Sequence, residues 1–118
     1  MNLIKRGELF YTDFGETVGS EESGVRPAVV IQNDIGNYHS PTTIVSAITS
    51  QPKNNMPTHI FISNQSLPKD SVILTEHIRT IDKSRLLDYI GKLTEEETNK
   101  LNEAIIVSLG LNEEKANE

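Results

Sequence analysis

Apolar positions along most of the chain come in short runs, some of them alternating with polar ones, and this pattern is typical of strands. Runs of this kind cover residues 8–13, 27–32, 43–49, 59–62, 71–80 and 89–91. Polar segments rich in turn-forming residues separate them. The longest, 15–26, holds three glycines and is predicted to be a loop of the length that often serves as a lid or binding loop in compact domains. Further breaks are expected as a turn at 33–37, a loop at 51–57 and a single helical turn at 82–85.

The last element reads as a helix from Thr94 to Leu109. Thr94 can cap its start, and Glu97 three residues later completes a capping box. Gly110 is placed to end it. One face, at a period of 3.6 residues, carries Leu101, Ala104, Ile105, Ser108 and Leu109.

Several strands followed by one helix predict a mainly β fold with a C-terminal helix, of the α+β class. We expect an antiparallel, barrel-like sheet with the helix packed on it. At 118 residues the chain fits one domain, expected over residues 1–111. The tail at 112–118 is expected to be disordered.

The composition of the chain limits the cellular compartment and the kinds of partner that we expect for the protein. The absence of cysteine excludes disulfides and thiolate metal sites and favours a reducing environment. The chain lacks both a signal-peptide pattern and an apolar run of the roughly 20 residues that a membrane span needs, so we expect a cytoplasmic protein with no membrane partner. The net charge is −6, but residues 94–118 carry seven acids and two lysines (−5), which leaves −1 for residues 1–93. A local basic groove for nucleic acid therefore stays possible.

The sequence gives little indication of a metal-binding or nucleotide-binding site. The three histidines, His39, His59 and His77, form no i, i+4 pair and have no nearby carboxylate cluster, so no metal site is expected. The chain has neither a Gly-rich phosphate loop after a strand nor a G-x-S-x-G elbow. We expect no cofactor.

Three polar residues remain as candidates, each with a plainer alternative. Arg26, where the long loop enters a buried strand, offers donors to a phosphate or is an ordinary surface arginine. Thr49 ends a strand and contributes a hydroxyl or only satisfies backbone groups. Strand alternation places His77 on one face with Thr75 and Arg79, where it either contacts phosphate or base or belongs to a solvated face.

Four ordered motifs resemble the MazF/PemK toxin family, with members of Gram-positive bacteria most similar. The opening Lys5-Arg6-Gly7-Glu8 is followed by Gly24-Val25-Arg26-Pro27, by Ser40-Pro41-Thr42 through Ala47-Ile48-Thr49, and by Pro57-Thr58-His59 with Asp70 through Asp82. The resemblance covers about residues 4–111.

This resemblance implies an SH3-like barrel of the CcdB/MazF/PemK type, working as a homodimer. It implies a toxin of a toxin–antitoxin system, an endoribonuclease that cuts single-stranded RNA at short motifs often containing ACA. The partner it implies is a MazE-like antitoxin that lays an acidic tail over the RNA groove. The family's catalytic arginine and threonine fall on Arg26 and Thr49. The residues implied to line the RNA groove are Ser20, Glu21, Asn33 and Gln51, with His77 standing where close relatives tend to have glutamine.

The expected reaction is metal-independent transesterification. The ribose 2′-OH attacks the adjacent phosphorus and leaves a 2′,3′-cyclic phosphate and a 5′-hydroxyl. Arg26 would stabilise the extra charge, Thr49 would add a donor, and His77 is a candidate for proton transfer. Phe14 is the best stacking residue for a base, with a core or interface role as the alternative.

Two other readings stay open. CcdB shares the implied fold but acts by binding DNA gyrase, without cutting RNA, and fold does not fix function. A toxin relic that only binds its antitoxin is the third reading. The Arg26–Thr49 pair discriminates, because a pure protein binder does not need it.

Overall fold

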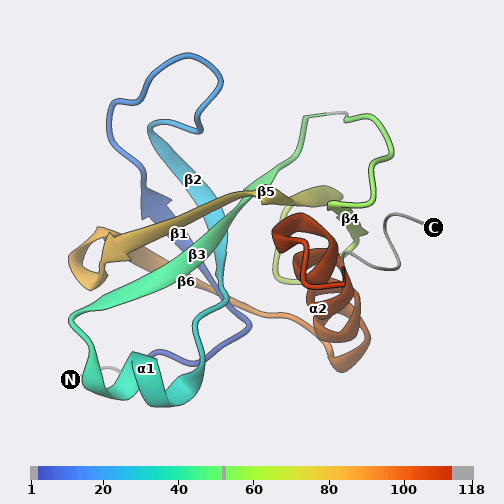
Figure 1. The fold of residues 1–118 in the computed structure, drawn as a ribbon. Coiled ribbons are helices and arrows are strands. Elements are labelled where there is room, and N and C mark those ends of the chain that lie inside the picture. Colours follow the sequence, from blue (N-terminus) through green and yellow to red (C-terminus); the bar gives the residue numbers. More distant parts are fainter. Residues whose placement is uncertain (1–2, 52, 113–118) are drawn as a thin grey trace.

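The computed structural model describes residues 3–51 and 53–112. Six strands form one antiparallel sheet in the order β4-β5-β3-β2-β1-β6 (Figure 1). The strands are β1 (Glu8–Asp13), β2 (Val25–Val30), β3 (Thr42–Thr49), β4 (His59–Ile62), β5 (Ser71–Asp82) and β6 (Leu86–Lys92). The helices are α1 (Asp34–His39), the short 3₁₀ turn η1 (Lys83–Arg85) and α2 (Glu95–Leu109). The prediction of a mainly β, antiparallel fold with a C-terminal helix is confirmed.

The twelve-residue strand β5 bends the sheet, because its first part pairs with both β3 and β4 while its second part pairs with β3 alone. Its register against β3 jumps between the Ser46–Ile78 pair and the Ala47–Leu74 pair. This bulge leaves residues 75–77 without partners on β3. A bulge re-aims side chains, and here it lies beside the candidate site.

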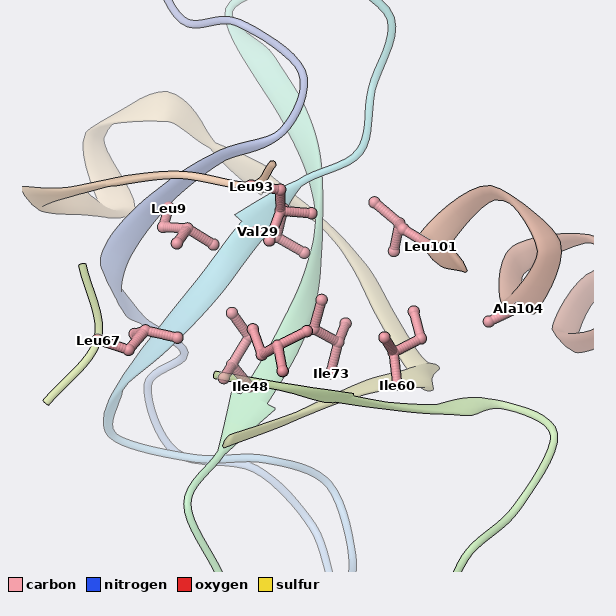
Figure 2. Close-up of a cluster of buried hydrophobic side chains, with 10 residues drawn as sticks. Leu9, Val29, Ile48, Ile60, Leu67, Ile73, Leu93, Leu101 and Ala104 are labelled. Atoms are coloured by element: carbon pink, nitrogen blue, oxygen red, sulfur yellow. The ribbon is translucent and has the colours of Figure 1, made fainter. Parts of the chain in front are cut away.

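Both faces of the central strands are buried, each by its own core. On one face, Leu9, Val29, Ile48 and Ile73 pack with residues from β4 and with Leu101 of α2 (Figure 2). On the other, the buried cluster consists of Ile4, Phe14, Ala28, Val30, Val45, Ala47 and Ile81. Continuous apolar runs such as 28–30 are therefore explained by burial on both sides of the strand.

Helix α2 begins and ends as its sequence predicts. Thr94 Oγ1 accepts from the backbone N–H of Glu97 at 3.2 Å, and Glu97 Oε1 accepts from the backbone N–H of Thr94 at 2.9 Å. Gly110 has φ +68°, the left-handed conformation in which glycine is least strained. Leu101 and Ala104 are buried, but Leu109, predicted on the same face, is 57% exposed.

Several other local predictions need correction. The predicted turn at 33–37 is helix α1, because the Asn33 side chain caps it by accepting from Gly36 N at 2.8 Å. Strand β2 begins at Val25, so Arg26 lies inside a strand and not in the loop. The last strand, expected at 89–91, is the longer β6. None of the described helices is long and apolar enough to cross a membrane. Of the tail expected to be disordered, residues 113–118 lie outside the described part of the chain.

Candidate active site

The two candidate catalytic residues lie on neighbouring strands. Strands β2 and β3 pair at Ala28–Ala47, and two residues farther along each strand from that pair lie Arg26 and Thr49. Arg26 is exposed, and its Nε donates to the Ser23 carbonyl at 3.2 Å. Thr49 is only 6% exposed, and its Oγ1 accepts from the Gln51 backbone N–H at 3.1 Å. A hydroxyl that accepts this bond keeps its own proton to donate.

Strand alternation gives both residues the same side of the sheet. Arg26 shares a face with Ala28, and Thr49 shares a face with Ala47. Ala28 and Ala47 both belong to the second core, the one that includes Phe14. The guanidinium and the hydroxyl therefore belong to the face that the β1–β2 loop borders.

The β1–β2 loop, residues 14–24, is closed at its neck by backbone hydrogen bonds. Phe14 N donates to the Gly24 carbonyl, and Gly24 N donates to the Gly15 carbonyl, each at 2.9 Å. Two arginines from other parts of the chain bind the backbone where the loop begins. Arg79 Nη1 donates to the Phe14 carbonyl at 2.6 Å, and Arg85 Nη1 donates to the Asp13 carbonyl at 3.0 Å. The loop thus enters and leaves the sheet beside Arg26 in a fixed geometry.

A pocket of about 310 Å³ opens between this loop and the bulge of β5. Its lining includes Phe14, Glu21, Glu22, Ala47, Glu76, His77, Ile78 and Arg79. Ala47 is two residues from Thr49, which at strand rise is about 7 Å, so the pocket adjoins the Arg26–Thr49 pair. Acidic, cationic and imidazole groups meet there, a combination able to hydrogen-bond a nucleobase edge.

The groove residues implied by the resemblance fall into two groups. Ser20 and Glu21 lie on the exposed β1–β2 loop, where a Glu21 carboxylate oxygen accepts from the Val18 N–H at 3.0 Å. Gln51 lies two residues after Thr49. Asn33 lies at the other end of β2, seven residues from Arg26, where it caps α1. Figure 1 shows α1 and the β1–β2 loop at opposite ends of the sheet. Within one subunit, the structure does not bring Asn33 together with Arg26 and Thr49.

The predicted alternation of Thr75, His77 and Arg79 is wrong because of the bulge. Thr75 is fully buried and faces α2: its hydroxyl donates to the Thr58 carbonyl at 2.7 Å, and the Ser108 hydroxyl donates to the Thr75 carbonyl at 2.6 Å. His77 and Arg79 line the pocket together with Glu76, which alternation had assigned to the opposite face.

Phe14 is a core residue. It is 2% exposed, and the Arg79 guanidinium carbon lies 5.9 Å from its ring centroid. Of the two roles predicted for this ring, the structure supports the core role. Among the described aromatic side chains near Gln51, Phe61 on β4 is 50% exposed and lines a hollow of about 370 Å³ with Gln51 and Lys53.

Sequence reasoning did not single out Glu76 and His59 as partners. His59 Nε2 lies 2.7 Å from Glu76 Oε2, and His59 Nδ1 lies 2.7 Å from the Asn54 carbonyl oxygen. These two groups are 17 residues apart in the sequence, and no spacing within the chain points to their contact. Within residues 3–51 and 53–112, no three His, Asp or Glu side chains gather closely enough to hold a metal ion.

Comparisons with known proteins show the family of the chain. A profile of the PemK-like, MazF-like toxins of type II toxin–antitoxin systems matches residues 5–109. The chain is 52% identical over 112 residues to "Endoribonuclease EndoA" of Bacillus subtilis (strain 168), covering 92% of this chain and 97% of that protein.

Solved structures share the fold. A mycobacterial structure described as an endoribonuclease in complex with its cognate antitoxin superposes with a TM-score of 0.79 at 26% identity, over 92% of this chain and 96% of that one. MazF from Deinococcus radiodurans gives a TM-score of 0.81 at 22% identity, over 93% and 99% of the two chains, and shows the fold alone.

Fold and sequence together define a small β-rich toxin with one C-terminal helix. The chain belongs to the PemK-like, MazF-like toxin family of type II toxin–antitoxin systems.

Proposed function

We propose that this toxin is a metal-independent endoribonuclease that cuts single-stranded RNA by attack of a ribose 2′-OH on the neighbouring phosphorus. Endoribonuclease activity follows from family membership and from the 52% identity to EndoA. The observation that carries the chemistry is the placement of an exposed arginine and a strand-ending threonine on one face of paired strands.

The negative charge that develops on the reacting phosphate determines the proposed role of Arg26. As the 2′-oxygen bonds to phosphorus, the phosphorane gains negative charge on its nonbridging oxygens. A guanidinium stabilises that charge with two parallel hydrogen bonds and stays protonated at neutral pH. The Thr49 hydroxyl, held by Gln51 N, adds a neutral donor to the same phosphate. The P–O5′ bond then breaks and leaves a 2′,3′-cyclic phosphate and a 5′-hydroxyl.

The reaction also moves one proton, from the 2′-OH to the departing 5′-oxygen. Arginine hardly deprotonates near neutral pH, so Arg26 is a poor base. His77 lines the 310 Å³ pocket together with Ala47, and it is the one described imidazole in that lining. We assign it either proton transfer or base contact.

Base recognition is proposed to use the β1–β2 loop and the chain after Thr49. Ser20 and Glu21 extend from the first, and Gln51 from the second. RNA-reading proteins splay out unstacked bases and bind their edges, and the mixed acidic and cationic lining of the 310 Å³ pocket suits such an edge. An ACA-containing motif is the expected target.

The partners proposed are a second copy of the chain and a MazE-like antitoxin, with action on cytoplasmic mRNA. The support is a structural relative described as bound to its cognate antitoxin. An acidic antitoxin tail would compete with RNA for Arg26.

The test is incubation of the purified protein with a long single-stranded RNA in EDTA. We expect discrete cuts, 5′-hydroxyl ends and cyclic phosphates. A substrate with a 2′-deoxy sugar at the mapped site should stay whole, because it lacks the nucleophile. Cutting that disappears in EDTA, or that persists at the 2′-deoxy site, would contradict the mechanism. A protein that leaves RNA intact under all conditions would favour action by protein binding instead.

A further inference from the structure

His59, the first residue of β4, has both ring nitrogens engaged by oxygen atoms. Its side chain is 4% exposed. Nδ1 lies 2.7 Å from the Asn54 carbonyl oxygen, and Nε2 lies 2.7 Å from Glu76 Oε2. The same residue's backbone N–H donates to the Met56 carbonyl at 2.9 Å. A single side chain therefore joins the segment before β4 to the bulge of β5.

The partners determine how many protons the ring carries. A carbonyl oxygen only accepts, and an ionised carboxylate only accepts, so each ring nitrogen must donate. Neutral imidazole has one N–H, and only the imidazolium has two. Partial burial raises the pKa of Glu76, but the hydrogen bond and the positive charge of His59 help to bring that pKa below its ordinary value. At neutral pH the carboxylate is thus ionised and needs a donor.

The two ends of this link both adjoin the candidate active site. Asn54 belongs to the segment that follows Thr49 and Gln51, the chain proposed to contact RNA. Glu76 lines the 310 Å³ pocket with Glu21 and His77. Hydrogen bonds from Thr75 N and Thr75 Oγ1 to the Thr58 carbonyl, at 3.0 and 2.7 Å, fix the backbone next to His59. The 53–57 segment is tied to this fixed backbone by the imidazole bond to the Asn54 carbonyl and by the His59 N–H bond to the Met56 carbonyl.

We propose that His59, as an imidazolium, is a positioning residue for RNA binding. By holding the 53–57 segment against Glu76, it keeps the chain that follows Thr49 in the conformation that binds RNA. The proposal deepens the proposed function and rests on it. His59 touches neither the phosphate nor Arg26 in this scheme. Losing one ring proton breaks one of the two bonds and releases either the segment or Glu76.

Other charged groups near the ring come from α2. Lys100 and Glu103 line a hollow of about 400 Å³ with His59, and Glu76 contacts the His59 ring from β5. The charges of Lys100 and Glu103 are opposite. Among the described hydrogen bonds and ion pairs, the His59 ring contacts Glu76, and Lys100 pairs with Glu96. Lys100→Met and Glu103→Gln should leave the pH dependence of RNA binding in place, whereas Glu76→Gln should remove most of it.

The kinetic test uses His59→Asn and His59→Gln in the full chain. Asparagine can reproduce only the Nδ1 bond and glutamine only the Nε2 bond, so each variant keeps at most one end of the link. We expect each to raise KM for a short RNA by about tenfold with kcat within about twofold, because a charge-assisted hydrogen bond that shapes binding is lost while the chemistry stays intact. KM of the unsubstituted protein should rise as the pH rises, since the imidazolium loses a proton, and this rise should be absent in both variants.

His39→Gln is the matched control, because His39 is an exposed histidine on α1 at the other end of the sheet. It should keep the unsubstituted KM and pH profile. Variants of His59 that match the unsubstituted protein in KM and pH profile would overturn the proposal. So would a fall in kcat with KM unchanged, which would make His59 part of the chemistry.

A second measurement does not depend on activity. Nitrogen-15 NMR of histidine-labelled protein should show both His59 ring nitrogens protonated at neutral pH. The backbone amide of residue 59, which donates to the Met56 carbonyl, should exchange slowly and should become fast in uniformly labelled His59→Asn and His59→Gln. A neutral His59 ring, or exchange unchanged by the substitutions, would overturn the link. Suppose that the protein gives the expected spectra and still cuts no RNA. In that case the proposed function fails, the link through His59 is structural only, and the proposal that His59 positions the chain for RNA binding fails with it.

Discussion

Arg79 and Phe14 are joined twice, although 65 residues separate them in the chain. Arg79 Nη1 donates to the Phe14 carbonyl at 2.6 Å, and the guanidinium carbon lies 5.9 Å from the Phe14 ring centroid. Phe14 begins the β1–β2 loop, and Arg79 is in the part of β5 after the bulge. This contact sets where the loop leaves the sheet beside Arg26.

Replacing Arg79 with lysine should loosen that loop. Lysine keeps the charge but loses the planar fork that reaches the carbonyl and covers the ring. We expect KM for RNA to rise about three- to tenfold, with faster amide exchange at Gly24, from loss of one charge-assisted hydrogen bond. Arg6→Lys is the control, since Arg6 Nε makes a comparable bond to the Ile31 carbonyl at 2.8 Å, away from the loop. Equal effects of the two substitutions on KM would contradict this role for Arg79.

Phe14 should behave as a core residue in unfolding experiments. Because its ring is 2% exposed, Phe14→Ala should lower the free energy of unfolding by about 3–5 kcal/mol. Phe14→Leu keeps most of the volume and should cost only about 1 kcal/mol. Urea titrations measure both. A Phe14→Ala protein as stable as the unsubstituted one, but weak in RNA binding, would restore the stacking role.

Asn33 should matter for stability and not for cleavage. Asn33→Ala removes the cap of α1 and should cost about 1 kcal/mol, while Asn33→Asp keeps an acceptor and should cost little. At temperatures where each protein is folded, both should retain kcat/KM within about twofold, because Asn33 lies at the end of β2 away from Arg26. A large drop in kcat/KM for Asn33→Asp would place this residue in the RNA groove after all.

Stability should depend on pH through Glu76. Its pKa in the folded protein is lowered, so its contribution is present above the unfolded pKa of about 4.3 and is lost as the pH falls through the lower folded value. The difference in urea midpoint between the unsubstituted protein and Glu76→Gln should therefore be larger at pH 7 than at pH 3. Glu96→Gln serves as the control, because Glu96 is 82% exposed and only pairs with Lys100. A difference that grows on acidification would contradict this sign.

Local signals predicted most of the fold. The bounds of β1 and β4 and the capping box of α2 are as expected, because each depends on residues within a few positions of one another. The prediction at 33–37 was wrong because asparagine favours turns and helix caps alike, and only the burial of Asn37 under its hydrogen bonds decides for a helix.

The placement of the candidate residues was predictable where it follows strand pairing and not where it depends on the bulge. Arg26 and Thr49 came from motif resemblance, and they lie two residues beyond the Ala28–Ala47 pair on β2 and β3. The faces of β5 assigned to Thr75 and Glu76 were wrong because alternation assumes an unbroken strand. No residue type in 75–77 indicates that a bulge occurs there. The His59–Glu76 contact joins two strands in space, so no sequence spacing reveals it.

Single-turnover cleavage by Arg26→Ala is the most direct test of the account. The substitution should lower the rate by at least about 10²–10³-fold, because it removes the charge that stabilises the phosphorane. The urea midpoint should stay close to that of the unsubstituted protein, since the exposed Arg26 side chain contributes one hydrogen bond to Ser23. Arg26→Lys should recover only part of the rate, because lysine has no bidentate fork. Cleavage by a folded Arg26→Ala protein at a rate near that of the unsubstituted toxin would contradict the central claim.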